Sequence, residues 1–248
     1  SDIKYTYKHQ TYFIKDLYLQ WSPAELAWGH FSITKLIANG VKITIPAKKI
    51  KKPQKEITPP KLPFAIEVKM ARIDDLSIGR KPNKFPFHMK SFMLAGLLRP
   101  NNINARIITN VDKPYPIKTD FNLRGSLGLY YFQLKAKSKH INWTVSGRGD
   151  QDSVQFKTTK GKTLGGTLSG DFHFRFEPQL QWNVNFTSKN VDLSQINKEW
   201  PSGLDVDIDT KGMIINNQPQ FGFIARFGVP GASVTFTGNR RKQWLMTW

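Results

Sequence analysis

The sequence predicts an all-β fold: one large, antiparallel-rich sheet, apolar on one face and polar on the other, with one short helix near residues 22–29. Apolar residues recur at every second position over most of the chain, as in the LQWNVNF run of residues 180–186. This period of two places all the apolar side chains of a strand on one face. Many short segments of this kind are separated by Gly and Pro turns without alternating helices, which argues against an α/β fold.

The first 45 residues predict two strands within 3–21 and then the short helix. Ser22 suits the N-cap, Pro23 suits the first helical position and Glu25 completes a capping box. Gly29 is placed to end the helix after about two turns. We therefore expect an N-terminal β segment over residues 1–45 that contains one capped helix.

Residues 46–63 differ in kind, because they are rich in lysine and proline. Proline removes backbone donors and the lysines repel one another, so this stretch predicts an extended linker or long loop. Its lysines suit contact with anionic lipid or a solvated spacer. Residues 64–248 are then expected to form an extended amphipathic sheet that continues to the end of the chain.

The strands expected in order after the helix fall in 31–33, 41–45, 64–70, 87–98, 103–109, 117–136, 141–147, 172–176, 180–186, 204–210, 213–216, 220–227 and 232–237. Pro178 marks a hairpin turn between two of the clearest strands. Residues 190–196 predict a loop with one helical turn. The order suggests a sheet that grows by the addition of hairpins.

Composition narrows the classes of function. Among 248 residues there are no cysteines, and the formal net charge is +19. Such a charge implies an anionic partner, such as nucleic acid, a membrane surface or an acidic glycolipid, although general basicity also explains it. No apolar run approaches the roughly 20 residues of a membrane-spanning helix. The opening Ser1-Asp2 carries neither a Met start nor a signal pattern, so we expect a segment of a longer protein.

The motifs of catalysis or metal binding in this sequence each lack residues that the chemistry requires. Gly161-Lys162-Thr163 matches the end of a phosphate-binding P-loop, but Phe156 stands where the motif requires glycine. Asp205, Asp207 and Asp209 lack the glycine and glutamate of a calcium loop, and alternate carboxylates on a strand lie about 6–7 Å apart. We expect a protein that is not an enzyme, with no catalytic residue, no metal site and no cofactor.

The aromatic residues alternate with amides and hydroxyls and share their faces with Leu, Val and Ile. A stacking groove for nucleic acid would place Arg and Lys beside them. No RRM, KH or OB signature is present. The aromatic faces are typical of a core or a lipid-binding surface, and we expect no nucleic acid as partner.

Two stretches resemble the TamB family, the large AsmA-like proteins of Gram-negative envelopes. The first is residues 17–26 with 29–33 and 40–45, which is similar to the N-terminal part of the family. The second begins at Gly166-Thr167-Leu168, continues through Leu180-Gln181-Trp182 and Asn190-Val191-Asp192, and ends at Trp200-Pro201 and Gly212. The missing membrane anchor, which family members carry at the N-terminus, supports the interpretation as a segment.

The resemblance implies a periplasmic β-taco, or open groove with an apolar interior, in a protein anchored in the inner membrane. It implies phospholipid transport between the inner and outer membranes, or assembly of outer-membrane β-barrel proteins and autotransporters with a BamA-like barrel as partner. Contact with the membrane itself would come through parts outside this segment. The amphipathic strands agree with this, because an acyl chain gains about 0.8 kcal/mol for each CH₂ that it buries.

Two other interpretations stay open: a scaffold that adds incoming strands to a sheet edge, and a closed basic β-domain that binds an anionic polymer. Each expected groove residue also suits ordinary packing between sheet layers. The residues that we expect to line a lipid groove are Phe172, Phe174, Phe176, Leu180, Trp182, Val184, Phe186, Leu204, Val206 and Ile208.

Overall fold

The computed structural model describes residues 2–7, 10–45, 65–80, 84–99, 101–215, 218–229, 232–239 and 243–247. The chain divides into two compact units, Ser1–Leu127 and Gly128–Trp248. The predicted linker 46–63 lies outside the described residues. The expected division into 1–45, 46–63 and 64–248 therefore stays a prediction.

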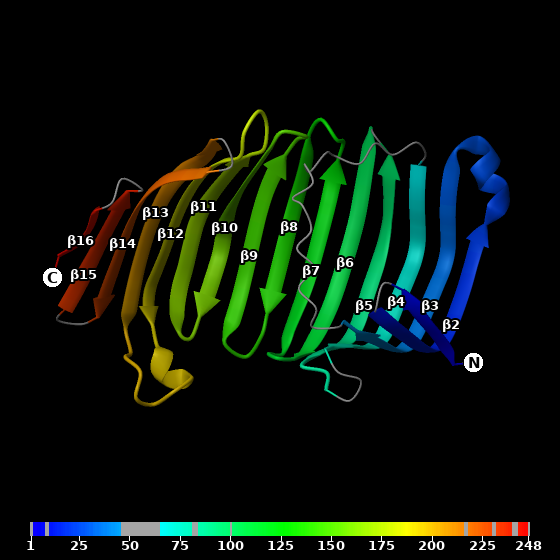
Figure 1. Ribbon diagram of the computed structural model, residues 1–248, viewed down its shortest axis with the longest axis horizontal. Coiled ribbons are helices and arrows are strands. Elements are labelled where there is room, and N and C mark those ends of the chain that lie inside the picture. Colours follow the sequence, from blue (N-terminus) through cyan, green and yellow to red (C-terminus); the bar gives the residue numbers. More distant parts are fainter. Residues whose placement is uncertain are drawn as a thin grey trace. The chain divides into compact units, whose positions relative to one another are not determined.

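The first unit is a sheet of seven strands that follow one another in sequence order (Figure 1). They are β1 (Ile3–Tyr7), β2 (Gln10–Ser22), β3 (His30–Thr44), β4 (Ala65–Gly79), β5 (Phe87–Arg99), β6 (Asn102–Lys113) and β7 (Ile117–Gly125). β3 and β4 pair in parallel, whereas the other neighbours in this unit pair antiparallel.

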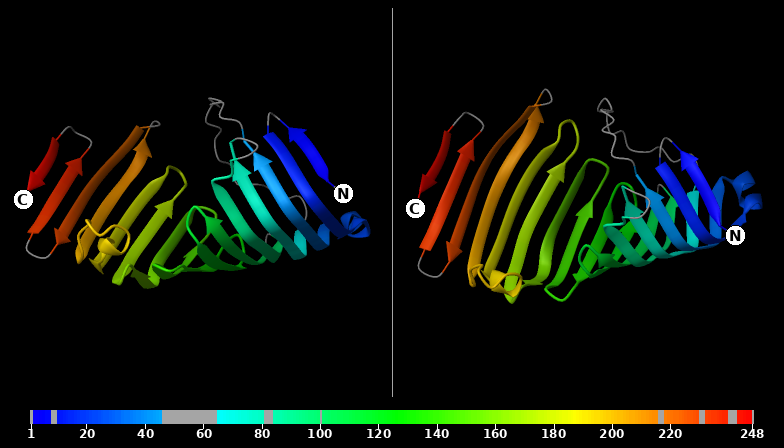
Figure 2. Two further views of the ribbon diagram at one scale, coloured as in Figure 1. Left: turned by 90° about the horizontal axis from the view of Figure 1, so that it is seen from below. Right: turned by 60° about the horizontal axis from the view of Figure 1, so that its bottom comes forward.

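The second unit is an antiparallel sheet in which each strand pairs with the next (Figure 2). Its strands are β8 (Tyr130–Lys137), β9 (Ile141–Gly149), β10 (Ser153–Thr163), β11 (Gly166–Arg175), β12 (Gln181–Val191), β13 (Leu204–Ile215), β14 (Gln218–Val229), β15 (Ala232–Asn239) and β16 (Gln243–Thr247). The prediction of an all-β, antiparallel-rich fold is confirmed.

The expected helix is a 3-10 helix, η1 (Pro23–Trp28), and its boundaries agree with the prediction. Pro23 begins it, and Gly29 ends it in the left-handed conformation, with its N–H bonded to the carbonyls of Glu25 and Leu26. The predicted capping box is wrong, because the Ser22 side chain makes no capping bond. Six residues are too few to sustain an α-helix without tertiary packing, so the tighter turn forms instead.

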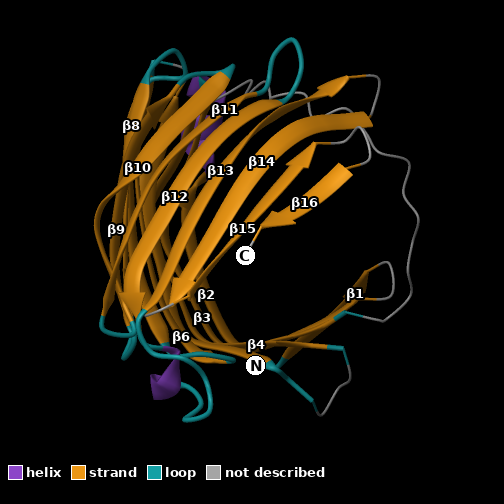
Figure 3. Ribbon diagram, turned by 90° about the vertical axis from the view of Figure 1, so that its left-hand side faces the viewer, coloured by secondary structure: helices purple, strands orange, loops and turns teal. Residues whose placement is uncertain are grey.

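The loop after β12 holds the expected helical turn, η2 (Leu193–Gln195) (Figure 3). The Asp192 side chain accepts a hydrogen bond from the Ser194 N–H at 3.1 Å. This satisfies one of the free donors at the start of the turn. Strand β10, by contrast, is not among the predicted strands, because its ladder after Phe156 continues with Thr and Lys and shifts register between Lys157 and Lys162.

The predicted strands 31–33 and 41–45 are one strand, β3, and the interruption between them is a left-handed residue, Gly40, at which the pairing with β2 and β4 keeps its register. Gly40 lies opposite Lys15 with a φ of +62°. Asp75 on β4 stands at the same level with a φ of +57°, and Lys90 on β5 and Asp112 on β6 fall at register shifts. Since a left-handed residue turns the backbone and moves the alternation by one, apolar residues three apart keep to one face across this level, which we call the bulge line.

The burial of β3 agrees with that explanation, because Ala38 at 5% exposure and Val41 at 7% are both buried although they are three residues apart. In β4, Ile73 and Leu76 are separated by the same interval around Asp75. The sequence breaks its period of two at this line, and the backbone breaks its alternation there as well. The apolar face of the first unit therefore continues across the bulge line.

The positive φ of Asp75 predicts a specific sensitivity. Asp75→Val is expected to lower the free energy of unfolding by about 1–2 kcal/mol, because a branched Cβ is strained in the left-handed region. Asp75→Gly removes the same carboxylate but accepts this conformation, so it serves as the matched control. Urea unfolding of both variants measures the difference, and equal midpoints would show that the backbone angle is not what matters.

Each unit is a single sheet layer in its described part. Extensive contacts between elements join only neighbouring strands, apart from η1 on β3. Among the described residues, the buried apolar side chains are small or aliphatic and none is aromatic: Ala38, Val41, Ala71, Ile103, Ala136, Val145, Leu164, Val191 and Ala225. The large aromatic residues thus keep part of their surface accessible.

Candidate functional site

The second unit carries a continuous apolar surface, because the register places its apolar residues side by side. Directly opposed residues of an antiparallel pair project from the same face. We call this surface the apolar face; its central row runs from β8 to β14. The row consists of Phe132, Gly147, Phe156, Phe172, Val184, Thr210 and Phe223.

Most of the predicted groove residues lie on this face. Phe172 and Phe174 come from β11, where they pair with Val184 and Trp182 of β12. Phe186 of β12 pairs with Ile208 of β13. On β13, Val206 pairs with Ser188, and Leu204 pairs with Val191 across a register shift. All of these predicted residues are half-buried, so each is partly accessible and partly packed against its neighbours.

Two predicted groove residues fall outside the strands. Phe176 follows the end of β11 and is 48% exposed, while its N–H donates to the carbonyl of Asp152. Leu180 precedes β12 and accepts a backbone bond from Ile214 at 2.9 Å. The cis Glu177–Pro178 bond lies between them, in the hairpin turn that the sequence predicts. These two residues sit at the end of the apolar face rather than within its rows.

The structure adds aromatic residues that the sequence analysis did not select. Phe156 stacks on Phe172 at 4.7 Å between ring centroids, and Phe132 lies 6.0 Å from Phe156. Phe221 lies 6.5 Å from Trp182 and 6.4 Å from Phe223. The period-two signal is present at both places, as Val154–Phe156 and as Phe221–Phe223–Ala225. Only the register shows that these rings share a face with Phe172.

Glycines make room for the rings on this face. A Cβ on Gly147 would lie 2.4 Å from the Phe132 ring and 2.6 Å from Cβ of Phe156. A Cβ on Gly212 would lie 2.4 Å from the Trp182 ring and 2.7 Å from Cβ of Phe221. The aromatic side chains therefore lean over neighbouring glycines and cover backbone that would otherwise be bare.

Two indole N–H groups on the apolar face are paired within it. The indole N–H of Trp182 donates to Oγ1 of Thr210 at 3.3 Å, and that of Trp143 donates to Oγ1 of Thr158 at 2.8 Å. A buried indole needs such an acceptor, and a threonine on the next strand supplies one without adding charge. The surface can thus meet an apolar ligand without leaving these donors unsatisfied.

The opposite face of the second unit is polar. Lys189 lies 3.4 Å from the carboxylates of both Asp205 and Asp207, which β13 presents two residues apart. Asp205 also accepts the Asn190 N–H at 2.7 Å, and this bond, followed by Lys189, lowers the pKa of its carboxyl. The three alternating aspartates of β13 thus belong to a hydrated strand face, and two of them pair with lysine.

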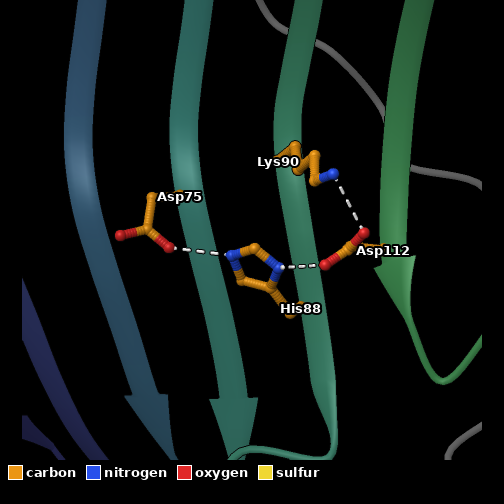
Figure 4. A network of polar contacts seen from close by, with 4 residues as sticks. All are labelled: Asp75, His88, Lys90 and Asp112. Atoms are coloured by element: carbon orange, nitrogen blue, oxygen red, sulfur yellow. Dashed lines mark hydrogen bonds and ion pairs between the residues drawn. The ribbon is translucent and has the colours of Figure 1, made fainter. Parts of the chain in front are cut away.

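The polar side of the first unit holds a chain of charges at the bulge line (Figure 4). Nε2 of His88 lies 2.9 Å from Asp75, and Nδ1 lies 3.4 Å from Asp112. Lys90 lies 3.1 Å from Asp112 and is the main cause of the lowered pKa of that carboxyl. Both ring nitrogens can donate only when the imidazole is protonated. This chain ties together the strands that carry the irregular positions.

Lowered carboxyl pKa values predict a loss of stability in acid. Asp150 accepts N–H bonds from Asp152 at 2.9 Å and Ser153 at 2.7 Å, and these bonds lower its pKa. The stabilisation is complete above the unfolded value of about 3.9 and is lost as the pH falls through the folded value. Asp150→Asn is therefore expected to flatten the dependence of stability on pH below about pH 4.

Urea unfolding between neutral and acidic pH measures this dependence for the wild type and for Asp150→Asn. Parallel curves for the two proteins would contradict the assigned role of the carboxylate in the β9–β10 turn.

No helix in the described part of the chain has the length and apolarity that crossing a membrane requires.

Comparison with known proteins places this face within a family. Residues 112–223 match the family model for the TamB N-terminal domain, and this match spans β7 to the first half of β14. It includes the second resembling stretch, around residues 166–212, but not the first, around 17–45. Searches of curated proteins and of solved structures give no significant match.

The family model thus covers the strands that form the apolar face. The match suggests a TamB-family role in outer-membrane assembly or lipid transport, in the envelope of Gram-negative bacteria. The match over residues 112–223 supports the interpretation of this chain as a fragment of a TamB-family protein.

Proposed function

We propose that this segment binds phospholipid acyl chains on its apolar face and carries them between the inner and outer membranes. The observation that carries the proposal is the row from Phe132 to Phe223, which combines aromatic and aliphatic side chains with no charged member. Soluble proteins seldom leave a larger apolar patch uncovered than a few hundred Å². An apolar partner that covers this face removes the free-energy cost of exposing it to water.

Acyl chains suit this face better than a compact ligand does. Each CH₂ that leaves water gains about 0.8 kcal/mol, so a long chain gains most from a long surface. The strands continue the same face from one to the next, and a chain can therefore move along it without crossing a polar barrier. Head groups would remain at the solvated margins of the face. We infer a binding protein rather than an enzyme, and one that needs no cofactor.

The proposed setting is the periplasm, in a protein anchored in the inner membrane by parts outside this segment. A BamA-like outer-membrane barrel is the proposed partner at the far end. Both belong to the proposal through the family and are tested separately from lipid binding.

Native mass spectrometry of the 248-residue chain, purified from a Gram-negative host, tests the proposal. We expect a population of chains that carries phospholipid, released by organic extraction. Recovery of lipid-free protein alone, or of protein bound only to nucleic acid, would overturn it.

A second function, strand addition during outer-membrane protein assembly, is favoured by one edge of the first unit. β1 pairs with β2 only between Gln10 and Ile14, so no described strand pairs with the same edge over residues 15–22. Leu17, Tyr18 and Leu19 are 42%, 51% and 51% exposed there. A free edge with accessible apolar side chains is a template for an incoming strand.

Photocrosslinkers at residue 18 and, as a control, at the paired position 12 test this second function. Capture of outer-membrane strands at residue 18 alone would support it, and equal or absent capture would overturn it.

A further inference from the structure

The polar side of the second unit contains an open depression of about 620 Å³, formed by β11 to β14. His173 pairs with Asn183, Asn183 with Lys211, and Lys211 with Gly222. Arg175 pairs with Gln181 one level further along. The side chains of these positions alternate with those of the apolar face and so lie on the opposite side of the sheet. Trp182, Gly212 and Phe221 of the apolar face also contribute to the lining.

The lining combines basic and amide side chains with apolar ones, and no carboxylate is among its residues. The basic and amide side chains are those of His173, Arg175, Lys211, Gln181, Asn183 and Gln220, and the apolar ones are those of Trp182, Met213 and Phe221. Adjacent strands lie about 4.8 Å apart, so Arg175 on β11 and Lys211 on β13 approach the amides of β12 from both sides. A guanidinium fork and an ammonium group that flank two amides suit phosphate oxygens.

The lack of a side chain at Gly222 leaves part of the depression open. A Cβ built on Gly222 would meet nothing within 4 Å, unlike the crowded Gly212 on the neighbouring strand. Any side chain at position 222 would therefore project into open space beside Lys211, to which Gly222 is paired. The absence of a side chain there leaves the lysine accessible to a ligand.

Carboxylates border the depression without lining it. Asp171 and Asp209 both oppose Asn185, one level beyond His173 and Lys211 on the same face. Asp150 also lies near Arg175, although its carboxylate is occupied mainly by the N–H groups of its own turn. Lys211 is thus a more sensitive probe of a ligand than Arg175, because part of the charge of Arg175 is offset by Asp150.

We propose that this depression binds a phosphate group, carried either by a phospholipid head group or by a soluble phosphate ester. The site does not depend on the lipid-carrying function, because it uses the opposite face of the same strands. Coulomb attraction to Arg175 and Lys211 would draw the anion in, and the amides of Gln181 and Asn183 would orient its oxygens.

Two probes distinguish the sources of the phosphate: glycerol 3-phosphate in solution, and phosphatidylglycerol vesicles with phosphatidylcholine vesicles as reference. Backbone chemical shifts report binding of the first, and co-sedimentation reports binding of the second, at an ionic strength of about 0.15 M. Saturable shifts at Lys211 and Gly222 indicate a soluble ester. Binding to anionic vesicles alone, provided that it is lost in the variant below, indicates a head group.

Gly222→Glu is the decisive variant, since it fills the open space and adds a carboxylate beside Lys211. We expect at least a tenfold loss of affinity for whichever probe binds, and Lys211→Gln should give a smaller loss. Gly228→Glu is the matched control, because it adds the same charge on the same face of β14, where its Cβ would lie 3.7 Å from Cβ of Asp205. It should retain affinity within about twofold.

Absence of binding to both probes, or equal losses in Gly222→Glu and Gly228→Glu, would overturn the phosphate site. Phe174→Glu on the apolar face is expected to leave phosphate binding unchanged. Failure of the lipid-carrying function is therefore distinguishable from failure of this site.

Discussion

Phe174→Glu is expected to reduce the phospholipid that co-purifies with this chain at least tenfold. Phe174 lies on the apolar face between Phe156, at 6.1 Å between ring centroids, and its paired residue Trp182. A carboxylate there must be stripped of water when an acyl chain covers it, at a cost of several kcal/mol. A tenfold loss needs only about 1.4 kcal/mol, so one buried charge is sufficient.

Quantitative lipid extraction, normalised to folded protein, measures this effect. Ser169→Glu places the same charge on the opposite face of the same strand and should retain bound lipid. Phe174→Leu keeps the site apolar and should retain most of it. If Phe174→Glu folds and carries as much lipid as Ser169→Glu, the apolar face serves packing alone.

Gly212→Val is expected to lower the free energy of unfolding by about 3 kcal/mol, near the upper end of the usual cost of overpacking. Its Cβ would lie 2.4 Å from the Trp182 ring, 2.6 Å from the Gln220 carbonyl oxygen and 2.7 Å from Cβ of Phe221. The ring can rotate away, but the backbone oxygen cannot move without breaking the pairing of β13 with β14. Displacing Trp182 would also disturb the apolar face.

Gly222→Val is the matched control, because Gly222 lies on the neighbouring strand and has no atom within 4 Å of its added Cβ. A branched residue there suits a strand and should change stability by less than about 0.5 kcal/mol. Urea unfolding curves of both variants measure these changes in the free energy of unfolding. Similar losses in the two proteins would show that the contact with Trp182 does not control stability.

The alternation of apolar and polar residues predicts which side chains share a strand face without knowledge of the register. Phe172, Phe174, Trp182, Val184 and Phe186 were assigned to one face from spacing alone, and the pairing of β11 with β12 places them together. This works because side-chain direction along a strand depends on local geometry, which each residue carries with it. The Pro178 turn and the Gly29 helix end follow from equally local preferences.

The spacing of apolar residues predicts the wrong strand bounds where the backbone departs from simple alternation. The break between Ala38 and Val41 suggested two strands, whereas a left-handed Gly40 lets one strand continue with the same face buried. Phe176 continued the alternation of β11 but lies beyond its end. In both cases the deciding factor is a neighbouring strand: the left-handed Gly40 is matched by the left-handed Asp75 on β4, and β11 ends where its pairing ends.

By itself, the sequence determined an all-β chain with apolar and polar strand faces, few helical turns and a resemblance to the TamB family. Only the tertiary structure decided which strands are neighbours, and so which residues meet: Phe156 with Phe172, Gly212 with Trp182, and Lys211 with Gly222. The reason is physical, since alternation is a property of one strand whereas register is a relation between two. Both proposed binding surfaces exist only through that relation.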